Sequence, residues 1–197
     1  MIFNNFLYQY KMAKFQNKYR IESTRARWWD YGNNAAYFVT INTKNRIPFF
    51  GKIVNQEMQL SELGKHAESC WYQIPEHFPF VKLGAFVVMP DHVHGILHID
   101  KPVPAIETQG FPAIETQYLA SLLPENKFGP QSKNLGSIIR GYKIGVTNQS
   151  KLICPDFKWQ PLFYDHIIFN DGEYQRIHNY IIANPKNWGK PKTGKRK

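Results

Sequence analysis

The sequence predicts an α+β fold: a ferredoxin-like or RRM-like antiparallel sheet with helices on one face and an added helix at the C-terminal end. The spacing of apolar residues along the chain predicts elements in the order strand, helix, strand, strand, helix, strand, helix. Two of the strand-like runs are separated by only a tight turn, which is typical of an antiparallel hairpin. The length of 197 residues suits one domain, and 43% hydrophobic residues argue against disorder.

The first strand and the first helix are predicted from their side chains. Residues 35–43, AAYFVTINT, are rich in the β-branched and aromatic side chains that pack well on a pleated sheet. From Leu60 onward apolar residues recur at helical spacing. Ser61 can cap this helix and Pro75 can end it.

The later elements follow the same two patterns. Residues 81–90 and 92–99 are apolar runs joined by a turn, and residues 164–169, YDHIIF, form a further strand. A final helix is expected over residues 172–184, where Pro185 follows. The helix before the last strand has an apolar stripe formed by Leu135, Ile138, Ile139, Tyr142 and Val146.

The positive charge of the chain is concentrated at its two ends. Residues 1–27 hold six basic residues and one acidic residue, and residues 186–197 hold six basic residues and no acidic one. Of the 25 basic and 15 acidic residues, 13 and 14 remain for residues 28–185, so the domain carries −1 of the net charge of +10. Basic ends favour a polyanion such as nucleic acid, because each neutralised phosphate releases a counterion. A solubilising tail is the alternative.

These patterns divide the chain into a basic N-terminal extension (1–27), one domain (28–185) and a basic C-terminal tail (186–197). Residues 101–130 contain five prolines and the short repeat VPAIETQ, FPAIETQ, so we expect a flexible insertion within the domain.

Cysteine content and hydropathy predict the compartment. The two cysteines, Cys70 and Cys154, form no disulfide framework, which favours a reducing cytoplasm. No run of residues approaches the roughly 20 apolar residues of a membrane span. We therefore expect a cytoplasmic protein without a membrane partner.

A histidine pair in PDHVHGILHI is a candidate metal site. His92 and His94 are two residues apart on a strand, so both rings leave the same face and can converge on one ion. His98 lies on that face too, but about 13 Å further along the strand. Two histidines alone leave a second interpretation open, namely ordinary polar side chains on a half-exposed strand.

The final helix, GEYQRIHNYIIAN, offers two tyrosines on different faces. Helical steps of 100° place Tyr174 with Ile177 and Ile181 in a buried stripe. Tyr180 and Asn184 are one turn apart on the flank of that stripe. Tyr180 is therefore predicted to be presented to solvent, although amphipathic packing alone would also explain the pattern.

Taken together, these segments resemble the single-tyrosine HUH transposases and, within them, the REP-associated tyrosine transposases. The resemblance rests on YFVTINTKNR, FVVMPDHVHGILHI, the second helix and FKWQPLFYDHIIFNDGEYQRIHNYIIANP, which occur in the order of the family between residues 35 and 185. It implies that Tyr180 is the catalytic nucleophile. It also implies that His92 and His94 bind the metal ion, with Asn184 as a third ligand.

The resemblance further implies cleavage and rejoining of single-stranded or hairpin DNA through a 5′-phosphotyrosine intermediate. The expected cofactor is a divalent ion, Mg²⁺ or Mn²⁺, and two histidines suit Mn²⁺ better because Mg²⁺ prefers oxygen. The expected assembly is a homodimer. Basic and aromatic side chains could line a DNA groove. The candidates are Arg25, Arg27, Trp29, Arg140 and Lys143.

Two other functions remain open at this point. A module that binds single-stranded or hairpin nucleic acid without cutting it would need the same fold and basic ends. A rolling-circle replication initiator or a relaxase would use the same chemistry in another process.

Overall fold

The computed structural model describes residues 29–102 and 132–190, and within these ranges the predicted α+β fold is confirmed. The predicted extension (1–27) and residues 191–197 of the basic tail lie outside the described residues, as does nearly all of the predicted insertion (101–130). No helix in the described part of the chain is long and apolar enough to span a membrane.

A four-stranded antiparallel sheet forms the centre of the fold. Its strands follow the order β4-β5-β1-β6, which is the ferredoxin-like order that the pattern of elements predicts. The strands are β1 (Ala35–Asn42), β4 (Val81–Met89), β5 (His92–Ile99) and β6 (Tyr164–Ile168).

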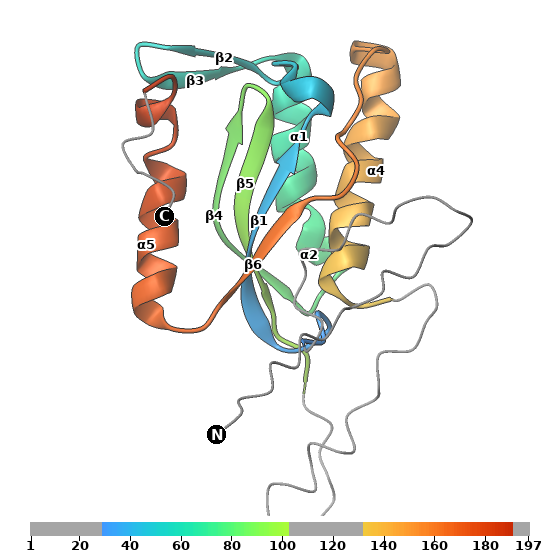
Figure 1. The fold of residues 1–197 in the computed structure, drawn as a ribbon. Coiled ribbons are helices and arrows are strands. Elements are labelled where there is room, and N and C mark those ends of the chain that lie inside the picture. The colour runs from blue at the N-terminus through green and yellow to red at the C-terminus, as the bar shows by residue number, and fades with distance from the viewer. Residues whose placement is uncertain (1–28, 103–131, 191–197) are drawn as a thin grey trace, which may run out of the picture.

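Helices cover the two faces of this sheet unequally. Three helices lie on one face and α5 packs on the other, where it contacts β4 and β5 (Figure 1). Because side chains alternate along a strand, Val39 points into the core under α1 and α4, whereas Phe38 points toward the α5 side. The helices are α1 (Glu62–Tyr72), α2 (Ile74–His77), α4 (Leu135–Ile153) and α5 (Asp171–Ile182).

Polar side chains cap the N-termini of the three long helices. Ser61, the predicted cap, accepts a hydrogen bond from the backbone N–H of Gly64 at 3.1 Å. Asn134 caps α4 and Asn170 caps α5 in the same way. Each cap satisfies a backbone donor that lacks a partner within the helix, which fixes where the helix starts.

A second, two-stranded sheet was not predicted. β2 (Gly51–Val54) and β3 (Glu57–Leu60) pair through a turn at Asn55 and Gln56, whose φ angles are 50° and 66°. Positive φ at both turn residues matches the twist of a hairpin. Glutamine is an unusual residue for this position, so the turn has a weak sequence signal.

Gly95, the residue after His94 on β5, leaves room for a tryptophan ring. A Cβ atom on Gly95 would lie 2.2 Å from Trp71 Cζ2. Trp71 is fully buried and stacks on Phe86 with ring centroids 4.4 Å apart. Gly95 therefore allows α1 to pack closely on β5 directly behind the histidine pair.

Candidate active site

The β4–β5 hairpin brings the two predicted histidines together on the α5 side of the sheet. His92 and His94 are only 4% and 5% exposed. Their Nε2 atoms lie 3.0 Å apart and their ring centroids 4.4 Å apart. The prediction that both rings leave the same face is confirmed, and both rings direct the same nitrogen toward one point.

Side chains behind the rings hold this orientation. His92 Nδ1 lies 2.5 Å from Asp91 Oδ1, and the other oxygen of Asp91 lies 2.9 Å from Arg46 Nε. His94 Nδ1 lies 2.8 Å from Thr40 Oγ1, on the neighbouring strand. Outer contacts of this kind fix the orientation of imidazole ligands in metal sites.

The last helix places Tyr180 beside the histidine pair. Its hydroxyl lies 3.3 Å from His94 Nε2, and its side chain is 50% exposed. The next residue, Ile181, is fully buried, and Tyr174 packs on the small core beneath α5. The predicted division of the helix into a buried stripe and a presented tyrosine is therefore confirmed.

Aromatic rings surround the two imidazoles. The Phe38 ring lies 5.4 Å from the His94 ring and 6.1 Å from the Tyr180 ring, measured between centroids. The Trp188 ring stacks over His92 at 6.0 Å, because the chain turns back after η2 (Pro185–Asn187). The sequence patterns predicted neither the contact of Phe38 with His94 nor that of Trp188 with His92.

The predicted third ligand, Asn184, lies one helical turn beyond Tyr180, immediately before η2. Its role as a ligand stays a prediction. The described residues contain no group of three or more histidine, cysteine, aspartate or glutamate side chains that could hold an ion. These residues would thus supply two imidazoles, and an amide, water or the substrate would supply the remaining ligands.

The predicted DNA-binding residues that the structure describes lie apart from the histidines. Arg25 and Arg27 lie outside the described residues. Trp29 packs against the main core and donates a hydrogen bond to the Tyr37 hydroxyl at 3.0 Å. Arg140 and Lys143 belong to α4, on the opposite side of the sheet from α5.

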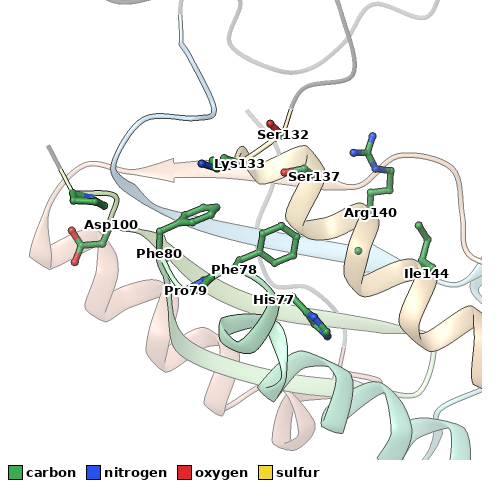
Figure 2. A pocket seen from close by; sticks show the side chains of 12 residues that line it. His77, Phe78, Pro79, Phe80, Asp100, Ser132, Lys133, Ser137, Arg140 and Ile144 are labelled. Carbon is green, nitrogen blue, oxygen red and sulfur yellow. The ribbon is translucent and has the colours of Figure 1, made fainter. Parts of the chain in front are cut away.

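Arg140 borders a hollow of about 740 Å³ on that opposite side. Figure 2 shows the hollow beside the rings of Phe78 and Phe80, with Lys133 nearby. This hollow is lined by α2, α4 and the segments that flank residues 103–131, and none of the predicted catalytic side chains reaches it.

Three functional candidates were missed by the sequence interpretation: Thr40, Arg46 and Asp91. Thr40 is opposite His94 in the strand register, and Arg46 approaches Asp91 from η1 (Lys44–Arg46). Only Asp91 had a local signal, because an acidic residue adjoins the first histidine in the sequence.

Comparison with known proteins relates this geometry to a known fold. No protein-family model matches the chain. An uncharacterized protein of Haemophilus influenzae is 38% identical over 167 residues, which cover 84% of this chain and 88% of the relative. A protein of Deinococcus radiodurans superposes with a TM-score of 0.42 and 15% identity, over 83% of this chain and 98% of that one.

The solved structure of the REP-associated tyrosine transposase bound to a REP hairpin superposes with a TM-score of 0.54. The two sequences are 23% identical, and the match covers 87% of this chain and 77% of that chain. The chain therefore belongs to one family with the Haemophilus influenzae protein, and its fold is that of a REP-associated tyrosine transposase, as the sequence resemblance implied.

Proposed function

We propose that this chain cuts and rejoins single-stranded DNA beside hairpins, with Tyr180 as the nucleophile. The observation that supports this most directly is the 3.3 Å distance between the Tyr180 hydroxyl and His94 Nε2, beside His92 Nε2. The phenol is half-exposed, so a DNA backbone can approach it. A transposase-like fold and a strongly basic chain agree with a DNA substrate.

The reaction would be a transesterification. The Tyr180 oxygen bonds to the scissile phosphorus as the bond from phosphorus to the 3′ oxygen breaks. The phenol loses its proton, and the released 3′ oxygen gains one to become a hydroxyl. The 5′ phosphate stays esterified to Tyr180, so a 3′ hydroxyl can later reverse the step without ATP.

The histidine pair fits a divalent cation. If Asp91 and Thr40 accept hydrogen bonds from the two Nδ1–H groups, both Nε2 atoms carry lone pairs and lie 3.0 Å apart, which is unfavourable without a positive charge between them. Metal–nitrogen bonds of about 2.1 Å allow both nitrogens to reach one ion. His92 and His94 would hold Mn²⁺ or Mg²⁺, and Asn184 is the proposed third ligand.

When bound, such an ion would neutralise charge on the scissile phosphate and favour the ionised phenol. The protein's own residues perform the rest. Asp91 and Thr40 orient the imidazoles, and α5 holds the phenol against them. Phe38 packs against both His94 and Tyr180, which limits the movement of the nucleophile.

A denaturing gel tests this proposal. The full chain is incubated with Mn²⁺ and a pool of labelled DNA hairpins with unpaired flanks, and protein-linked label is measured. Wild type is expected to form an adduct, and Tyr180→Phe is expected to form none. Tyr174→Phe is the matched control, because it removes a hydroxyl from the same helix on the buried side.

Tight binding of the hairpins without any adduct would contradict the enzymatic proposal and favour a non-catalytic binding module. An adduct that persists in Tyr180→Phe would assign the nucleophile to another residue.

A further inference from the structure

α5 covers only part of the sheet face beside Tyr180, and the start of β6 is exposed. The helix packs mainly on β4 and β5, and it also contacts Phe38 of β1 and His166 of β6, which leaves the start of β6 at the edge of this face. Tyr164 stands there opposite Thr40 in the strand register, and its side chain is 52% exposed. The centroids of the Tyr164 and Phe38 rings lie 6.2 Å apart, with an angle of 69° between the ring planes. Phe38 therefore contacts both the Tyr164 ring and the Tyr180 ring.

A hollow of about 220 Å³ adjoins Tyr164 at the β6 edge of the sheet. Two primary amides line it beside apolar side chains and one half-exposed aromatic ring. The lining residues are Asn42, Gln160, Pro161, Leu162, Phe163 and Tyr164. A flat ring offers a stacking surface for any base, and amides can pair with the edge of a base.

The register sets the distance between this hollow and the histidines. Thr40 is paired with His94 on one side and with Tyr164 on the other, and Asn42 is paired with His92. Neighbouring strands are about 4.8 Å apart, so Tyr164 lies about 10 Å across the sheet from His94. The hollow is therefore within reach of a nucleotide near a phosphate bound at Tyr180.

Two cationic side chains contact residues that line the hollow. Arg46 contacts the Asn42 side chain and is 49% exposed. From the other side of the sheet, the Lys143 ammonium donates to the carbonyls of Gln160 and Leu162 at 2.8 and 2.7 Å. The half-exposed Arg46 therefore offers a positive charge to a DNA strand that crosses the hollow.

We infer that this hollow binds one unpaired nucleobase of the DNA strand whose neighbouring phosphate is attacked by Tyr180. The base stacks on Tyr164, and the Asn42 and Gln160 amides contact its edge. This inference rests on the proposed function, and it adds a base-binding subsite that would influence where the strand is cut.

Binding measurements with abasic DNA test the subsite. Fluorescence anisotropy with a chelator present gives the affinity of the full chain for a labelled hairpin with an unpaired flank, intact or abasic at one position at a time. At one flank position the abasic DNA is expected to bind wild type about 5- to 100-fold more weakly, the range for one stacked base. Tyr164→Ala should lose a similar factor with intact DNA and become insensitive to the abasic position.

Two variants serve as controls. Tyr164→Phe keeps the ring and should behave as wild type. Tyr72→Ala removes a tyrosine that is similarly exposed, at 59%, from α1 on the opposite face, and should also behave as wild type.

The failure of this inference and the failure of the proposed function are distinguishable. If Tyr180-dependent adducts form but Tyr164→Ala keeps the wild-type response to abasic DNA, the subsite is wrong and the proposed function stands. If no DNA yields an adduct while Tyr164-dependent base binding is measured, the cleavage proposal fails and the hollow still binds a base. An unchanged affinity of wild type for every abasic probe overturns the subsite.

Discussion

Replacing Asp91 by asparagine is expected to weaken the binding of Mn²⁺ to the histidine pair. The Asp91 carboxylate lies 2.5 Å from His92 Nδ1 and 2.9 Å from Arg46 Nε, and its side chain is only 10% exposed. The substitution keeps the shape and an acceptor oxygen but removes the charge. The imidazole is then less basic and less firmly oriented.

The size of the effect follows from these contacts. A hydrogen bond to a charged group contributes about 1.5 to 3 kcal/mol, and a neutral one about 0.5 to 1.5 kcal/mol. The difference of about 1 to 1.5 kcal/mol corresponds to a loss of about 5- to 15-fold in affinity. Asp91→Ala removes the acceptor as well, and its loss should lie in the range of about 10- to 100-fold.

Titration calorimetry of the full chain with Mn²⁺ measures these affinities directly. Asp100→Asn is the matched control, since Asp100 also pairs with a cation, Lys82, but lies just beyond the opposite end of β5. Equal affinities of wild type and both Asp91 variants would refute the positioning role of Asp91. An equal loss in Asp100→Asn would show that net charge, and not orientation, controls binding.

Two further predictions concern stability. Gly95→Ala places a methyl group 2.2 Å from a ring carbon of Trp71, which is held between Phe86 and Tyr142. Gly95→Ala should lower the free energy of unfolding in urea by about 1 to 3 kcal/mol. Gly172→Ala is the control and should leave it unchanged, because the nearest atom to the added methyl group is 3.4 Å away. Equal stabilities of wild type and Gly95→Ala would contradict the close packing behind the histidines. Burial raises the pKa of Tyr37 to about 12, so the stability contributed by its protonated phenol is complete below about pH 10 and is lost as the pH rises through about 12. The free energy of unfolding of wild type should therefore fall more steeply than that of Tyr37→Phe between these pH values, and parallel profiles would argue against the burial of this hydroxyl.

Local patterns were sufficient to predict most of the fold. Apolar spacing and the Ser61 cap marked α1, and alternation marked the hairpin that carries His92 and His94. Helical geometry also separated Tyr180 from Tyr174, because burial on an amphipathic helix repeats with the helical period.

The parts that could not be predicted depend on contacts between distant segments. Thr40 reaches His94 through the β1–β5 register, and Trp188 reaches His92 because the chain reverses after α5. Arg140 lies away from Tyr180 because α4 packs on the sheet face opposite α5. The apolar stripe of a helix does not specify which face of the sheet the helix covers. Sequence patterns fix which face of an element is apolar, but not which partner it meets.

The central claim is that His92, His94 and Tyr180 act as one centre on a DNA backbone. Mass spectrometry of the protein–DNA adduct, after digestion of both components, tests it most directly. The prediction is a 5′-phosphonucleotide attached to Tyr180, formed by wild type and absent when His92 and His94 are both replaced by alanine. Attachment to any other residue, or an undiminished yield without the two histidines, would contradict it.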